Sequence, residues 1–257
     1  MDEKIHGTTM PVLELTLQPG ESVVTESGEF SWMTDAITFS TNTGGSVGGS
    51  GGGGIMGALK RVVAGGSLFM TTWTAEGGVG SISFASKMPG HIVPVDISPG
   101  NEVMVHRHGF MAGTQGIELT MGFQQSLGGM VFGGEGFILQ KIGGNGRAWM
   151  DLSGEVLAFD LAAGQTMRAH PGHIGMFQAS VSFTVQRIPG LVNRYMGGDG
   201  HRFAVLTGPG RIWLQSMPIP VLAEVLSHYI SDDDRHGAVE AGAAGGIAGR
   251  MLGDMFR

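Results

Sequence analysis

One short pattern occurs three times in the 257-residue chain and strongly limits the folds available to it. The three copies align without a gap: PVLELTLQPGESV at 11–23, HIVPVDISPGNEV at 91–103 and EVLAFDLAAGQTM at 155–167. Apolar residues alternate along the first half of each copy, which is typical of a strand with one face in a core. A shared glycine column then supplies the positive φ of a tight turn: Gly20, Gly100 and Gly164. Each copy therefore predicts a β-hairpin.

A second pattern, strand–G-x-G–strand, also occurs three times and is a hairpin signal of its own. Its copies are GVGSISF at 78–84, GNGRAWM at 144–150 and GPGRIWL at 208–214. The two patterns alternate, beginning with the first hairpin and ending on a G-x-G unit that nothing follows. We predict that the N-terminal hairpin pairs with this last unit and closes a ring of three repeats, because closure removes free sheet edges.

These patterns predict an all-β fold of the double-stranded β-helix or β-sandwich kind, with three internal repeats in pseudo-threefold relation. The predicted single domain covers 1–230, and its repeats lie at about 41–119, 120–185, and 186–230 together with 10–40. Helical spacing of apolar residues predicts short helices at 55–63 and 221–230. The acidic, Gly/Ala-rich stretch 231–257 predicts a flexible tail.

Composition excludes several classes of function. The formal net charge of −7 argues against a non-specific nucleic-acid binder, which needs a basic face. The chain has no cysteine, so disulfides and thiolate metal sites are excluded. No apolar run approaches the roughly 18 residues of a spanning helix, and the first ten residues lack the apolar core of a signal peptide. We expect a cytoplasmic protein without a transmembrane segment; peripheral membrane association stays open.

The segment GNEVMVHRHG carries the most suggestive polar residues. Gly100, His106 and His108 match the first half of a cupin metal motif, and the third hairpin copy is followed by His170 and His173. The first copy has Glu26 in the column of His106 and His170. No glutamate follows His108 at the cupin spacing, and alternation from Val103 and Val105 predicts that His106 and His108 face away from the core. We therefore assign no catalytic, cofactor-binding or metal residue; outward histidines also fit an oligomer interface.

Two arginines share a column directly after the G-x-G turn. Arg147 and Arg211 occupy it in two copies, and Ser81 occupies it in the remaining one. Such arginines could bind an anion, cap the turn or pair with a neighbouring subunit.

Four segments together resemble the family named for altered inheritance of mitochondria: GIMGALKRVVAGGSLFMTTWTA, PGHIVPVDI, PGNEVMVHRHGFMAG and GEVLAFDLAAGQTMRAHPGHIGMFQ. The resemblance covers 10–230. It implies a fold akin to the tryptophan RNA-binding attenuation protein, with internal threefold repetition. Eukaryotic members are associated with the mitochondrial inner membrane and its cristae. Without a transit peptide, this chain is similar to the bacterial members, which are mostly uncharacterised, and no active site follows from the resemblance.

The leading hypothesis is a non-enzymatic β-scaffold that acts as a homo-oligomer or through a protein partner, without a cofactor. One alternative is a cupin-like metal protein that uses His106, His108 and His170. Another is an RNA-binding module, which rests on fold analogy alone.

Overall fold

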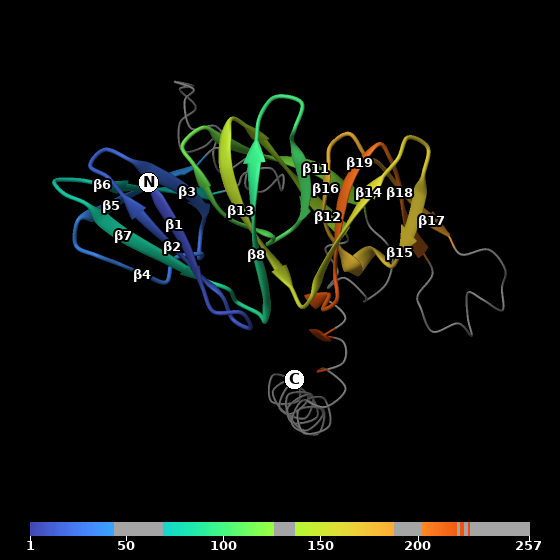
Figure 1. The fold of residues 1–257 in the computed structure, drawn as a ribbon, viewed down its shortest axis with the longest axis horizontal. Coiled ribbons are helices and arrows are strands. Elements are labelled where there is room, and N and C mark those ends of the chain that lie inside the picture. Colours follow the sequence, from blue (N-terminus) through green and yellow to red (C-terminus); the bar gives the residue numbers. More distant parts are fainter. Residues whose placement is uncertain (44–68, 126–136, 188–201, 220–221, 224–225, 227–257) are drawn as a thin grey trace, which may run out of the picture. The chain divides into compact units, whose positions relative to one another are not determined.

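A computed structural model describes residues 1–43, 69–125, 137–187 and 202–219, together with 222, 223 and 226. The chain divides into a compact unit, Met1–Pro218, and a second unit, Ile219–Arg257. The described part of the first unit is built almost entirely of β-strands (Figure 1). This confirms the predicted all-β, sandwich-like class.

After β1 (Asp2–His6), the strands form three consecutive sets of six, which we call repeats 1, 2 and 3. Repeat 1 contains β2 (Val12–Leu17), β3 (Ser22–Glu26), β4 (Trp32–Met33), β5 (Ile37–Thr43), β6 (Phe69–Ala75) and β7 (Gly80–Ala85). Repeat 2 contains β8 (Gly90–Ile97), β9 (Val103–His106), β10 (Phe110–Thr114), β11 (Ile117–Gln125), β12 (Phe137–Gly144) and β13 (Gly146–Ser153). Repeat 3 contains β14 (Val156–Leu161), β15 (Thr166–Ala169), β16 (Ile174–Gln178), β17 (Ser182–Arg187), β18 (Arg202–Thr207) and β19 (Gly210–Gln215). A 3₁₀ turn, η2 (Pro171–His173), precedes β16.

The same antiparallel pairing occurs inside every repeat. The last strand pairs with the first and the third, as β7 does with β2 and β4. The fifth strand pairs with the second and the fourth, as β6 does with β3 and β5. Repeats 2 and 3 follow the same scheme. Each repeat therefore contributes two three-stranded halves.

Successive repeats are joined edge to edge. β3 pairs with β10, and β9 pairs with β16, so that half of one repeat and half of the next form one continuous sheet. The result is four sheets: β1-β2-β7-β4, β5-β6-β3-β10-β13-β8, β11-β12-β9-β16-β19-β14 and β15-β18-β17. Successive sheets enclose three hydrophobic clusters, one for each repeat. In the first cluster, Leu13, Leu15 and Leu17 from β2 are fully buried.

The glycine columns fulfil the predicted roles. Gly20, Gly100 and Gly164 have φ of 85°, 87° and 77°, as the tight turns require. The strands β7, β13 and β19 each begin at the second glycine of a G-x-G motif. The predicted strand–turn–strand order is confirmed for both patterns, but the predicted hairpins are wrong. β2 and β3 lie in different sheets, as do β6 and β7, and the other two repeats are the same, so each turn leads the chain from one sheet to the next.

The prediction that the N-terminal hairpin closes the last repeat is wrong. β2 and β3 pair with β7 and β6 of their own repeat, whereas the G-x-G unit of repeat 3 pairs with β14 and β15. The predicted boundaries at 41–119, 120–185, and 186–230 with 10–40 therefore cut across the observed repeats. An alternating order of two motifs fits both assignments. The chain adopts the one in which the two strands of each first pattern pair with the strands of the next G-x-G unit along the sequence.

The predicted helix at 55–63 and the predicted tail at 231–257 lie outside the described residues. Within 221–230, the described residues Leu222, Ala223 and Leu226 are helical. Among the described residues we find no helix with the length and apolar character needed to cross a membrane.

Candidate functional site at the seams between repeats

Two clusters of polar side chains lie where successive repeats meet, and we call them seam 1 and seam 2. In seam 1, Glu26 ends β3 and accepts a 2.7 Å hydrogen bond from the Nε2 of Gln140 on β12. Burial raises the pKa of Glu26 against the opposing effect of this bond. The nearby carboxylate of Glu29 raises the pKa further, whereas Lys87 and Arg107 lower it.

Seam 1 contains two more carboxylates, both held by neighbouring donors. The ammonium group of Lys87 donates to Glu29, whose side chain is almost fully buried. Asp151 accepts from the hydroxyl of Ser86 at 2.9 Å and from the backbone N–H of Lys87 at 3.4 Å. Burial is the main cause that raises the pKa of both Glu29 and Asp151. Seam 1 thus groups three acids with two basic residues between repeats 1 and 2.

Seam 2 is centred on His106, which ends β9 as Glu26 ends β3. Its Nδ1 donates to the carbonyl of Arg107 at 2.6 Å, and its Nε2 is shielded from solvent. Burial lowers the pKa of His106 to about 4, against opposing effects of the Arg107 carbonyl and the Gln215 side chain. The ring is therefore neutral at physiological pH.

Gln215 on β19 connects this histidine to repeat 3. Its Oε1 accepts from the backbone N–H of Ser153 at 3.1 Å, and its Nε2 donates to the carbonyl of Gly172 at 3.3 Å. The Nδ1 of His173 donates to the backbone carbonyl of Gln215 at 2.7 Å. The two seams are built from equivalent positions of successive repeats. Asp151 in seam 1 and Gln215 in seam 2 each lie five residues after the second glycine of their G-x-G motif.

The other histidines singled out in the sequence are His108, His170 and His173. His108 has a φ of 68° and is exposed. The rings of His170 and His173 meet edge to face with centroids 5.9 Å apart, and Nδ1 of His170 accepts from the N–H of Gly172 at 3.3 Å. In the part of the chain that the structure describes, no three His, Cys, Asp or Glu side chains are grouped so that they could hold a metal ion.

The prediction that His106 and His108 share one outer face is wrong. β9 ends at His106, and the chain then turns, with the N–H of Gly109 donating to the carbonyl of His106 at 2.9 Å. Strand alternation therefore does not extend to His108, and His106 is half-buried in the seam.

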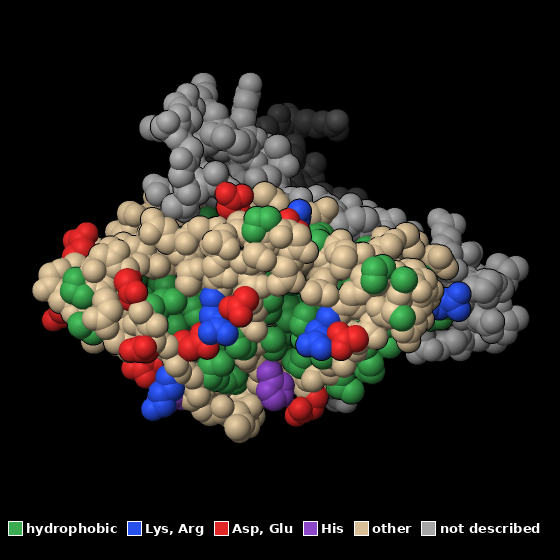
Figure 2. Space-filling view, turned by 45° about the horizontal axis from the view of Figure 1, so that its top comes forward, with side chains coloured by type: hydrophobic (Ala, Val, Ile, Leu, Met, Phe, Trp, Pro, Cys, Tyr) green, Lys and Arg blue, Asp and Glu red, His purple; other side chains and the backbone are tan. Residues whose placement is uncertain are grey.

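The two arginines of the G-x-G column form ion pairs within the chain. Arg211 makes two 2.7 Å hydrogen bonds to Asp160, its direct partner across β14 and β19. The Nε of Arg147 lies 3.1 Å from Oδ1 of Asp96, the residue directly opposite it on β8. Figure 2 shows such basic and acidic side chains next to each other, with exposed hydrophobic side chains around them. Exposed pairs of this kind contribute little to stability, so their arrangement mainly orders the surface.

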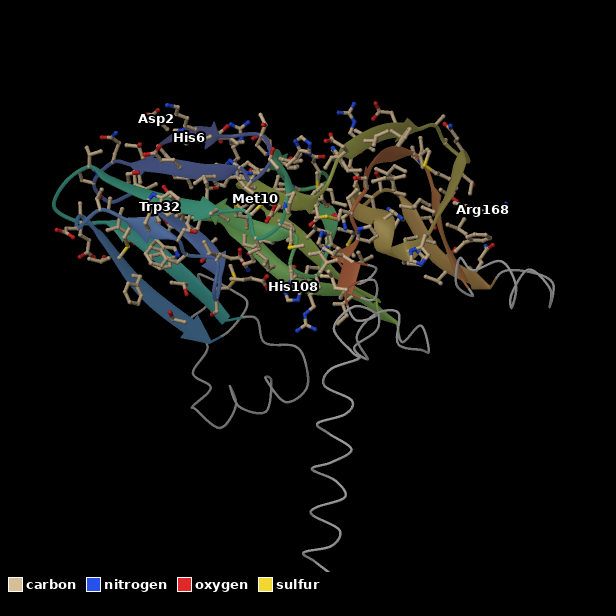
Figure 3. All side chains as sticks on the ribbon, turned by 90° about the horizontal axis from the view of Figure 1, so that it is seen from below. Asp2, His6, Met10, Trp32, His108 and Arg168 are labelled. Carbon is tan, nitrogen blue, oxygen red and sulfur yellow. The ribbon has the colours of Figure 1, made fainter. Side chains whose placement is uncertain are left out.

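Exposed aromatic residues form a second candidate, which sequence reasoning missed. Phe30 and Phe39 flank Trp73, with ring centroids 4.8 Å and 5.3 Å from its indole. Trp73 is buried and donates to Thr25 at 3.0 Å, but Phe30 and Phe39 are 43% and 63% exposed. We call these two phenylalanines the aromatic surface. Trp32, two residues after Phe30, is 55% exposed on β4 (Figure 3). The only available sequence signal was the run FSW, which does not reveal exposure.

Comparison with known proteins identifies the family. The family model described as "Mitochondrial biogenesis AIM24" matches residues 3–217, which is most of the chain. The chain belongs to the AIM24 family. This agrees with the resemblance noted in the sequence.

AIM24 relatives include an uncharacterised protein of Streptococcus pyogenes serotype M6, which is 26% identical over 222 residues. The alignment covers 86% of this chain and 87% of the relative. The crystal structure of another Streptococcus pyogenes protein superposes with a TM-score of 0.70 at 22% identity, covering 89% of this chain and 99% of the other. That likeness supports the fold, and both relatives are bacterial, in agreement with the bacterial membership expected from the sequence.

Proposed function

We propose that this AIM24 protein is a non-enzymatic β-scaffold that binds a protein, either another copy of itself or a different partner, through the aromatic surface. The observation that carries the proposal is the exposure of Phe30 and Phe39 around a buried tryptophan. Exposed aromatic groups of this kind are typical of protein-binding surfaces, because they bury a large area at low cost in side-chain entropy.

The polar side chains support a structural role for the rest of the molecule. The bond from Gln140 to Glu26 joins repeat 2 to repeat 1, and the bond between Gln215 and the backbone of Ser153 joins repeat 3 to repeat 2. The bond from Gln215 to Gly172 holds this glutamine within repeat 3. Buried polar groups that satisfy one another in this way fix the register of packed elements. Glu26, one of the residues singled out in the sequence as a candidate for chemistry, therefore supports the scaffold reading.

A lipid surface is the other class of partner that exposed aromatic residues can bind. The formal net charge of −7 disfavours contact with anionic lipid headgroups, which attract basic segments. We therefore propose that the aromatic surface binds a protein rather than a lipid surface, and we keep the cytoplasmic location expected from the sequence.

Site-specific photocrosslinking in cells tests this assignment. A benzophenone amino acid replaces Phe39 in one protein and Val79 in a matched control, since Val79 is also exposed, at 56%, but lies outside the aromatic surface. We expect a protein adduct of defined mass at position 39 and none above background at position 79. Lipid adducts at position 39, or equal labelling at both positions, would refute the proposal.

Elemental analysis of protein purified without chelator separates the scaffold from the cupin-like alternative. We expect no stoichiometric zinc, iron, manganese or nickel. About one metal ion per chain, lost on the double substitution His106→Ala and His108→Ala, would instead establish the metal protein.

A further inference from the structure

The edge-to-edge pairing between repeats occurs twice in the chain, and we call each instance a joint. In both joints the second strand of one repeat pairs with the third strand of the next: β3 with β10 and β9 with β16. The residue three positions after the shared turn glycine (Gly20, Gly100 or Gly164) marks the register. Val23 faces Thr114 in the first joint, and Val103 faces Gln178 in the second. The two joints therefore have the same register.

Half of a third joint is present on repeat 3, which no further repeat follows among the described strands. β15 is the second strand of its repeat, so it corresponds to β3 and β9, and Met167 corresponds to Val23 and Val103. Among the described strands, β15 pairs only with β18. The N–H of Gly208 donates to the carbonyl of Gln165 at 2.9 Å. Because bonded residues alternate along an antiparallel ladder, the backbone N–H and C=O of Arg168 point toward the free edge.

The complementary half lies in repeat 1. β4 is the third strand of its repeat, so it corresponds to β10 and β16, and within the described strands it pairs only with β7. Trp32 faces Ser83 on β7 just as Ala112 faces Trp149 and Met176 faces Trp213. Ala112 and Met176 are fully buried, whereas Trp32 is 55% exposed.

We infer that the β4 edge of one copy pairs with the β15 edge of a second copy and so reproduces the internal joint. Transfer of the internal register predicts that Thr34 faces Met167, Met33 faces Arg168 and Trp32 faces Ala169. Trp32 and Arg168 lie in different sheets, far apart in the first unit (Figure 3), so the contact is head to tail. Such a heterologous contact builds a closed ring or an open filament. The inference deepens the self-association part of the proposed function.

Cysteine pairs test the register directly, because the native chain contains no cysteine. Thr34→Cys is made in one full-length preparation and Met167→Cys in another. In the predicted joint these residues form a non-hydrogen-bonded pair, in which the Cα atoms lie about 4.5 Å apart, close enough for a disulfide. We expect the mixture to give a covalent dimer under mild oxidation. The control mixes Thr34→Cys with Arg168→Cys, whose side chain points to the opposite face of the strand.

A second pair of variants tests the backbone contact by analytical ultracentrifugation. Arg168→Pro removes the outward N–H at an edge position that tolerates proline, whereas Arg168→Ala keeps it. We expect Arg168→Pro to be monomeric and Arg168→Ala to associate like the native chain. Equal cross-linking of the matched and shifted cysteine pairs, or equal association of both Arg168 variants, would overturn the inference.

The outcome is distinguishable from failure of the proposed function, because Phe39 lies outside the joint. Adducts at position 39 without register-specific cross-linking would refute the joint alone. Register-specific cross-linking without adducts at position 39 would refute the aromatic surface alone.

Discussion

Truncating the same leucine in two repeats should have very different consequences. Leu13 and Leu157 each lie seven residues before the turn glycine of their repeat, and each faces the last strand of its repeat. Leu13 is fully buried in the first hydrophobic cluster beside Phe84, whereas Leu157 is 52% exposed on β14. The pair therefore separates the effect of burial from that of position in the repeat.

The expected magnitudes follow from these exposures. Leu13→Ala removes a fully buried side chain and leaves a cavity, which should lower the free energy of unfolding by about 2–5 kcal/mol. Leu157→Ala loses only part of a transfer free energy and opens no closed cavity, so its cost should be about 1 kcal/mol or less. At about 2–4 °C per kcal/mol for a domain of this size, Leu13→Ala should lower Tm by roughly 4–20 °C.

Urea unfolding followed by circular dichroism measures both changes. It should be run on dilute protein, so that association between copies does not cover Leu157. A destabilisation by Leu157→Ala as large as that by Leu13→Ala would show that the sequence column, rather than the exposure seen here, sets the energetics.

Three further predictions concern the seams and the turns. Because the pKa of Glu26 is raised in the folded state, the free energy of unfolding falls as pH rises from the ordinary carboxyl pKa through the folded value. Glu26→Gln should remove this fall and stabilise the protein at neutral pH. Urea midpoints measured across pH test this. His106 should have the opposite effect, because its pKa is lowered from 6.5 to about 4 in the folded state. The free energy of unfolding should therefore fall on acidification through this range. If His106→Gln lost as much stability on acidification as the native chain, burial of a neutral His106 would be contradicted. Gly90→Ala should lower Tm more than Gly100→Ala. A Cβ at Gly90 would lie 2.1 Å from the carbonyl oxygen of Leu152, whereas a Cβ at Gly100 meets no neighbour and adds only the strain of a φ of 87°. Equal losses of Tm would contradict the close approach at Gly90.

The strands and turns of the two repeated patterns were readable from the sequence, because they depend on neighbours in the chain. Their pairing into hairpins was predicted wrongly, because strands of both kinds can pair with distant partners in separate sheets. Glycine at the turn and alternating leucines before it are local signals, and both correspond to the observed strands. Burial was less readable. Leu13 and Leu157 occupy the same column, but only Leu13 is covered, because coverage depends on what the next sheet places above the strand.

The order of the repeats and the polar seams could not be derived in the same way. An alternating sequence does not determine whether the strands of the first pattern pair with the G-x-G unit before them or after them, so the ring closure was predicted wrongly. The histidines were placed on one face by extending strand alternation past His106, where β9 in fact ends. Gln140 and Gln215 gave no signal at all, because an isolated glutamine acquires its role only when a distant strand presents a partner.

The identical joints also bear on how this architecture changes over evolutionary time. In a closed barrel, strand number, tilt and diameter are linked, so adding strands alters every existing contact. Here each repeat of six strands has one joining edge on its third strand, for the repeat before it, and the complementary edge on its second strand, for the repeat after it. Duplication of one repeat within the gene would insert a unit whose third strand pairs with the repeat before it and whose second strand pairs with the repeat after it, as in other repeat proteins. Chain length can therefore grow in whole units without redesign of the joints already present.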